Sequence, residues 1–217
     1  MKTDSQLQQD VMAELKWEPA VHAAQIGVEV KDGVVTLAGE VGSFGEKWNA
    51  ERAAQRVSGV QALTVELAVK LSEFGKRTDA DIARSAETAL GWSSSVPVNA
   101  VKVLVDAGKL TLSGNVEWQY QRQDAFDSVR YITGVTGVSN QIGIKPLLSA
   151  TVVKSDIEAA IKRRAVADAQ TIAVDVKGAN VTLTGTVHSW AERELATRSA
   201  WSSLGVKNVV DKMTITF

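Results

Sequence analysis

The chain has 217 residues, of which 45% are hydrophobic and 23% are charged, and these proportions are typical of a folded globular protein and exclude a disordered one. A net charge of -1 argues against nucleic acid as a partner, because that binding draws on clustered positive charge. The absence of cysteine excludes disulfides and thiolate metal sites.

The first ten residues lack the continuous apolar segment of a secretory signal, and no later window is apolar enough to predict a membrane span. If Met1 is the natural start, we expect a cytoplasmic protein that is not an integral membrane protein. A truncated start would allow a periplasmic location.

The sequence repeats three times. Shifting it on itself by 75 and by 146 residues aligns three copies of 69 residues each without a gap, at 3–71, 78–146 and 149–217. A period of this length, with several elements in each copy, predicts three small domains in series.

Each copy begins with a hydroxyl residue that can cap a helix, namely Thr3, Thr78 or Ser149. Apolar residues then follow at spacings of four, which predicts a helix with one buried face. These residues are Leu7, Val11 and Leu15, then Ile82, Ala86 and Leu90, then Val153, Ile157 and Ile161.

Alternating apolar residues come next and predict a strand that begins near Ile26, Val101 or Ile172. A tight turn follows at 31–33, 106–108 and 177–180. A second strand then carries a recurring Val-Thr-Leu-x-Gly or Leu-Thr-Leu-x-Gly motif, so the two strands form a hairpin.

Glycines recur at two places in the copies. Gly39, Gly114 and Gly185 interrupt the second strand, where we expect a bulge or a close backbone approach. A second helix over about 45–57, 120–132 and 191–204 is predicted to stop at Gly59, Gly134 and Gly205 as its left-handed C′ residues. A third strand closes each copy.

Each copy therefore reads helix, strand, strand, helix, strand. We predict an α+β fold of three tandem two-layer α/β sandwiches, each with both helices on one face of a three-stranded mixed sheet. The open sheet face carries small polar residues such as Thr36 and Ala38, and is either solvated or used for docking.

The Ile-x-Val-x-Val strand at Ile26, the Asp32-Gly33 turn, the Val34 to Val41 motif and the closing Gly59-Val60 resemble the BON domain, a family named for bacterial osmotically inducible and nodulation proteins. The resemblance covers nearly the whole chain. It implies a non-catalytic phospholipid-binding or interaction module of osmotic or envelope stress, with no cofactor.

The six tryptophans vary between copies, so we expect them to face something outside each domain's own core. Trp17 and Trp92 share a position just past the first helix, where the third copy has Arg163; Trp48, Trp118, Trp190 and Trp201 have no tryptophan counterpart. Packing between units and contact with a lipid headgroup or protein partner are both open.

The best basic candidate is the run of Lys162, Arg163 and Arg164, which either offsets the dipole of its helix or contacts anionic lipid. His22 and His188 lack the neighbours that a metal site or a general base needs. The candidate lipid or partner contacts are Trp17, Trp92, Trp118, Trp190, Lys162, Arg163 and Arg164.

Our first hypothesis is a non-catalytic BON-type adaptor that binds anionic phospholipid or a protein partner. The alternative is a structural scaffold that forms homo-oligomers through its open sheet faces, without a small ligand. KH-like RNA binding is the third, but the chain lacks a Gly-x-x-Gly loop on a basic surface.

Overall fold

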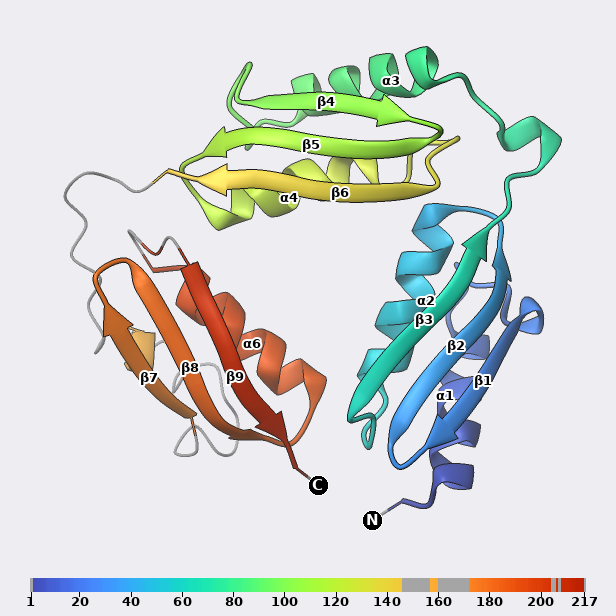
Figure 1. Ribbon diagram of the computed structural model, residues 1–217, viewed down its shortest axis with the longest axis vertical. Coiled ribbons are helices and arrows are strands. Elements are labelled where there is room, and N and C mark those ends of the chain that lie inside the picture. The colour runs from blue at the N-terminus through green and yellow to red at the C-terminus, as the bar shows by residue number, and fades with distance from the viewer. Residues whose placement is uncertain (1, 146–156, 160–171, 204–205, 207, 217) are drawn as a thin grey trace.

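The computed structural model describes residues 2–145, 157–159, 172–203, 206 and 208–216 (Figure 1). In the described part, the first two units run helix, strand, strand, helix, strand, and the elements of the third run strand, strand, helix, strand. The first unit consists of α1 (Asp4–Trp17), η1 (Ala23–Gln25), β1 (Ile26–Lys31), β2 (Val34–Val41), α2 (Phe44–Arg56) and β3 (Ala62–Val69). The second consists of α3 (Asp79–Trp92), β4 (Val101–Asp106), β5 (Lys109–Val116), α4 (Gln119–Val129) and β6 (Gly137–Ile144), and η2 (Glu73–Gly75) precedes it. The third contains β7 (Ile172–Lys177), β8 (Asn180–Val187), α6 (Trp190–Trp201) and β9 (Asn208–Ile215).

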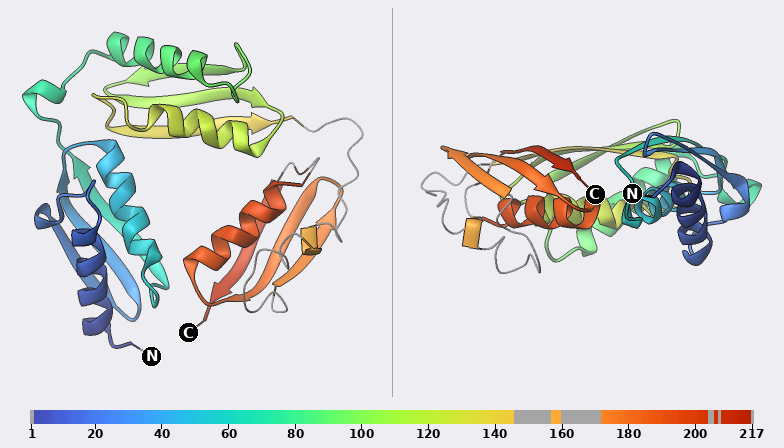
Figure 2. Two further views of the ribbon diagram at one scale, coloured as in Figure 1. Left: turned by 180° about the vertical axis from the view of Figure 1, so that it is seen from behind. Right: turned by 90° about the horizontal axis from the view of Figure 1, so that it is seen from below.

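Each unit has a three-stranded mixed sheet in which the second strand is central. It pairs antiparallel with the first strand and parallel with the third, which confirms the predicted hairpin and crossover. The helices lie on one face of the sheet, as the sequence predicted, so the fold is α+β (Figure 2). No described element covers the other face of any of the three sheets.

The first helices begin where the sequence predicted. The hydroxyl of Thr3 accepts a hydrogen bond from the backbone N–H of Gln6, and the Gln6 side chain accepts one from the N–H of Thr3. The hydroxyl of Thr78 caps α3 by accepting a hydrogen bond from the N–H of Asp81, and it donates one to the Asp81 carboxylate. Ser149 and most of the helix predicted at the start of the third copy lie outside the described residues. Ile157 of that helix is described and is fully buried.

A carboxylate fixes each of the first two hairpins to its helix. Asp4 accepts hydrogen bonds from the N–H groups of Asp32 and Gly33, at 2.8 and 3.1 Å. Asp79 accepts equivalent bonds from the turn of the second unit, both at 2.9 Å. The third copy has Ala150 at this position, so the same bond cannot form there.

Gly39 and Gly114 make the close backbone approach that the sequence allowed, and not a bulge. Both have positive φ angles, of 137° and 123°, while the strand pairing continues through them. A Cβ atom at either position would collide with a backbone carbonyl, of Gln25 or of Ala100. Gly185 has the same φ, at 124°.

The second helices end earlier than predicted, and the expectation that Gly59 and Gly134 are their C′ residues is wrong. The last helical residue of α2 is Arg56, and Val57 already has an extended backbone, with its N–H bonded to the carbonyl of Ala54. Gly59 and Gly134 still have positive φ angles, of 109° and 97°, and form the turn into the third strand. Gly205 lies outside the described residues.

The three units lie around a common centre. The second helices α2, α4 and α6 face that centre, and α1 and α3 lie farther out (Figure 2). The three sheets lie along one side of the molecule and the helices along the other. The units therefore dock through their helices, and among the described residues the open sheet faces form no contact between units.

Candidate functional site

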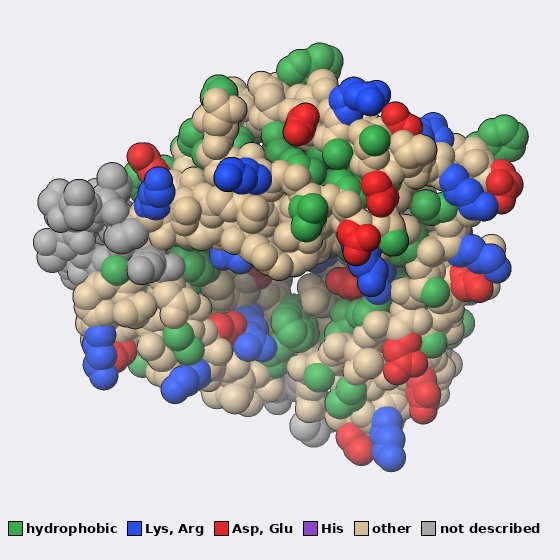
Figure 3. Space-filling view, turned by 45° about the horizontal axis from the view of Figure 1, so that its top comes forward, with side chains coloured by type: hydrophobic (Ala, Val, Ile, Leu, Met, Phe, Trp, Pro, Cys, Tyr) green, Lys and Arg blue, Asp and Glu red, His purple; other side chains and the backbone are tan. Residues whose placement is uncertain are grey.

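A cavity of about 1300 Å³ lies where the three units meet. Its lining comes from α2, α4 and α6, and the space-filling view shows a hollow at this place (Figure 3). Four tryptophans contribute to the wall: Trp48, Trp118, Trp190 and Trp201. Trp190 packs against the core of the first unit and not of its own, as the sequence predicted, whereas Trp201 packs against the core of its own unit, so the expectation is wrong for that ring.

Aromatic and cationic side chains join the first unit to the second. The rings of Phe44 and Phe126 meet edge to face with centroids 6.3 Å apart, and the guanidinium of Arg130 lies 3.9 Å from the centre of the Trp48 ring. The ring of Tyr131 occupies the space where a side chain at Gly45 would be. This seam is close-packed.

A charged contact joins the first unit to the third. Arg52 donates two hydrogen bonds to the carboxylate of Glu194, at 2.9 and 3.0 Å, and Arg198 donates a third at 2.6 Å. The indole N–H of Trp190 also donates to the backbone carbonyl of Val60, at 2.9 Å. The paired geometry of an arginine with a carboxylate makes this contact directional.

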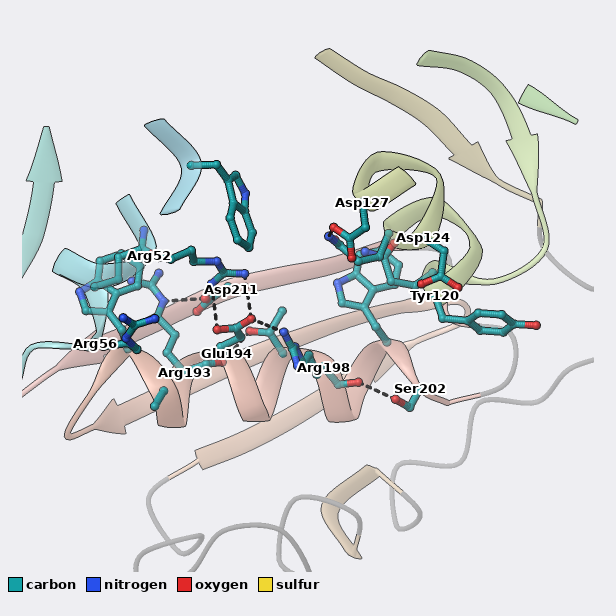
Figure 4. Close-up of a pocket in the computed structure, with 18 of the residues that line it drawn as sticks. Arg52, Arg56, Tyr120, Asp124, Asp127, Arg193, Glu194, Arg198, Ser202 and Asp211 are labelled. Atoms are coloured by element: carbon teal, nitrogen blue, oxygen red, sulfur yellow. Dashed lines mark hydrogen bonds and ion pairs between the residues drawn. The ribbon is translucent and has the colours of Figure 1, made fainter. Parts of the chain in front are cut away.

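The other arginines of the cavity also have carboxylate partners. Arg193 donates to Asp211 at 2.6 Å (Figure 4). Hydrogen bonds from Arg56 to Glu18 and Glu14 raise the pKa of the Arg56 guanidinium, against a smaller opposing effect of burial. The positive charges in the wall are thus compensated by the protein itself.

Glu46, at the start of α2, is buried and holds the preceding loop. Its carboxylate accepts from the N–H groups of His22 and Gly42, both at 2.7 Å, and contacts the His22 ring at 2.9 Å. Burial raises the pKa of this carboxyl, but the hydrogen bonds outweigh burial and hold the pKa below its ordinary value. In the second unit, the uncharged side chain of Gln121 holds the residues before α4, because its Oε1 accepts from the N–H groups of Glu117 and Trp118.

His22 is therefore part of this loop contact. In the third unit, His188 occupies the position of Gly42 and donates its backbone N–H to Glu192, which occupies the position of Glu46. Within the described residues, no group of three or more histidine, aspartate or glutamate side chains is arranged to hold a metal ion.

The predicted contact residues fall into three places. Trp17 and Trp92 stand at the ends of α1 and α3, with 81% and 87% of their surfaces exposed. Trp118 and Trp190 line the central cavity. The basic run 162–164 lies outside the described residues. Trp48 and Trp201 also line the cavity but were not among the predicted contacts. Like Trp118, they have no tryptophan at the matching position of the other copies, and this signal could have identified them.

The sequence pattern of the BON domain matches residues 3–70, 78–146 and 149–216. The chain belongs to the BON domain family. This BON protein is 31% identical over 146 residues to osmotically-inducible protein Y of Escherichia coli strain K12, an alignment that covers 65% of the chain and 73% of that relative.

Two solved structures of CdsD, a structural protein of the type III secretion system of Chlamydia trachomatis, also match the BON chain. The first is 13% identical with a TM-score of 0.25 and covers 97% of this chain and 92% of that one. The second is 12% identical with a TM-score of 0.26 and covers 96% of each. In the part of the BON chain that the structure describes, no helix has the length and apolar character to cross a bilayer.

Proposed function

We propose that this BON protein is a non-catalytic binding protein that attaches to anionic phospholipid surfaces during osmotic stress. The observation that carries the proposal is the exposure of Trp17 and Trp92 at matching positions of two units, at 81% and 87%. Neither ring contributes to the core of its unit, so folding alone does not account for them. The name of the relative, osmotically-inducible protein Y, supports the physiological setting.

Tryptophan suits the boundary between lipid and water, because its large ring is apolar and its indole N–H can stay hydrated. Burying about 150 Å² of each ring would contribute roughly 4 kcal/mol. Lys16, which is exposed beside Trp17, adds a positive charge that could contribute about 1 kcal/mol near an anionic surface. Arg163 occupies the matching sequence position in the third copy.

Vesicle flotation tests the proposal. We expect the full chain to float with vesicles that contain phosphatidylglycerol, and the double variant Trp17→Ala, Trp92→Ala to remain in the soluble fraction. Phe74→Ala is the matched control, because Phe74 is 93% exposed but lies between units and outside the matching pair. Equal flotation of the wild type and the double variant would reject these rings as the contact.

A homo-oligomeric scaffold is the second candidate, and the uncovered sheet faces favour it. Apolar side chains on the strands are exposed in all three units: Leu104 at 65%, Val34 at 39% and Val210 at 37%. Mass measurement by light scattering across a hundredfold concentration range would test this candidate. A constant monomer mass would exclude it, and growth in mass that Leu104→Ser abolishes would support it.

A further inference from the structure

One end of the central cavity differs from the rest in its charge and in having aromatic rings that no described arginine or lysine covers. Figure 4 places Tyr120 and Asp124 of α4 and Ser202, which follows α6, at this end, and Arg52 and Arg56 at the other. Trp118 is the N-cap residue of α4, and Trp201 is the last residue of α6. All of these residues line the cavity.

The carboxylate of Asp124 is half-buried and uncompensated. Among the described residues, no hydrogen bond or ion pair reaches its side chain, whereas Asp211 and Glu194 in the same wall each hold an arginine. A half-buried carboxylate attracts a positive charge more strongly than one in bulk water does. The C-terminal end of α6 carries a negative helix dipole and the N-terminal end of α4 a positive one, so the two helix ends offset each other here and the charge of Asp124 decides the sign.

The unused hydrogen-bonding capacity at this end is that of an acceptor. Gln119 also lines the cavity, and its Oε1 atom is buried without a hydrogen-bond partner. Together with the two oxygens of Asp124, it can accept hydrogen bonds but finds no donor in the described structure. A ligand that fits here must therefore donate N–H or O–H groups.

The aromatic rings at this end are open to a cation. Trp48 and Trp190 already have arginines over their rings, at 3.9 to 5.2 Å from the ring centres. No lysine or arginine of the described residues lies over Trp118, Tyr120 or Trp201. The rings of Trp118 and Tyr120 lie near each other, with centroids 6.4 Å apart and an angle of 32° between their planes. Such rings attract cations through their electron-rich faces.

The second and third units leave this end accessible. In the described parts of the two units, no hydrogen bond, ion pair or ring contact joins them, while the first unit contacts both through the seams at Phe44 and at Arg52. At this end, one side of the cavity is therefore lined by the second unit and the other side by the third, and a ligand bound here would touch both.

We propose that the end of the cavity between α4 and α6 binds an organic ammonium ion that carries N–H donors. The ammonium group donates hydrogen bonds to Asp124, and its alkyl part lies against the rings of Trp118, Tyr120 and Trp201. Anionic ligands do not fit this end, because the uncompensated charge that the described residues place there is negative.

Calorimetric titration of the full chain with 1,4-diaminobutane tests the site. We expect saturable binding that Asp124→Asn weakens at least about tenfold, because the charge-assisted hydrogen bonds are lost. Asp106→Asn removes the same charge from an exposed hairpin of the same unit and should leave the affinity unchanged. Tyr120→Ala should weaken binding about two- to fivefold.

Two further ligands separate the contributions of charge and hydrogen bonding. Tetramethylammonium has the charge without N–H groups, and 1,4-butanediol has the length without the charge, so both should bind more weakly than the diamine. Equal affinity of Asp124→Asn and wild type for the diamine, equal affinity of wild type for the diamine and tetramethylammonium, or no heat of binding would each overturn the proposal. These outcomes are independent of vesicle flotation.

Discussion

Replacing Gly39 with alanine should destabilise the first unit strongly. Gly39 lies in the middle of β2, opposite Ile26, with a φ of 137°. A Cβ atom there would strike the backbone carbonyl of Gln25, which is held at the end of η1 immediately before β1. The carbonyl cannot move away without shifting the edge strand, because the next residue along the chain, Ile26, is paired with β2.

The magnitude has two parts. An L-residue with a positive φ costs about 1–2 kcal/mol, and relief of a backbone collision in a packed unit adds about 1–3 kcal/mol. We therefore expect a loss of about 3 kcal/mol, which is a large fraction of the stability of a small domain. For a unit of this size, such a loss lowers the melting temperature by at least about 12 °C.

Urea and thermal unfolding followed by circular dichroism measure this loss. Gly178→Ala is the matched control, because Gly178 also has a positive φ, of 61°, but a Cβ there would meet no atom within 4 Å. The control should lose only the conformational part, about 1 kcal/mol. If Gly39→Ala cost no more than the control, the close approach to Gln25 would not be the reason for the glycine.

Three other perturbations have definite expected outcomes. Asp79→Ala should cost about 1–2 kcal/mol in urea unfolding, because it leaves two turn N–H groups without their acceptor, and an unchanged midpoint would contradict that role. Glu46 has a lowered pKa, so the stability it contributes is present above its ordinary pKa of 4.5 and disappears as the pH falls through the lower native pKa. The difference in unfolding free energy between wild type and Glu46→Gln should therefore shrink in acid, and a constant difference from pH 7 to pH 3 would disagree. Glu194→Gln weakens the contact of Arg52 with the third unit, and faster amide hydrogen exchange at the α2–α6 seam should report it; unchanged exchange would show that the ion pair does not hold the seam.

The sequence was sufficient for the described elements of the units, because their signals are local. The hydroxyl of Thr3 and the side chain of Gln6 lie within one helical turn, and the Asp32-Gly33 pair specifies its own turn. The helix ends were predicted less well. Gly59 was predicted to be the residue that ends α2, but the helix ends earlier, where the N–H of Val57 bonds to the carbonyl of Ala54.

Contacts between distant residues could not be predicted. Asp4 holds a hairpin 28 positions away, and nothing in its local pattern distinguishes it from an ordinary acidic residue in a first turn. Arg130 lies over Trp48 only because two units dock at one angle, which depends on the shapes of the side chains between them. The variation of the tryptophans between copies indicated that Trp17, Trp92 and Trp190 lie outside their own cores, but not that Trp201 packs against its own core or that four of the rings share one cavity.

The arrangement of the three units around a shared cavity is the central claim, and the distance between the first and third units tests it most directly. The chain has no cysteine, so Thr64→Cys and Thr184→Cys would introduce two unique labelling sites on the exposed faces of β3 and β8. Pulsed electron paramagnetic resonance of the spin-labelled protein should give one narrow distance distribution, which broadens when Glu194→Gln is added. A broad distribution in the protein with an intact Arg52–Glu194 contact would show that the units move independently, and would contradict a cavity shared by all three.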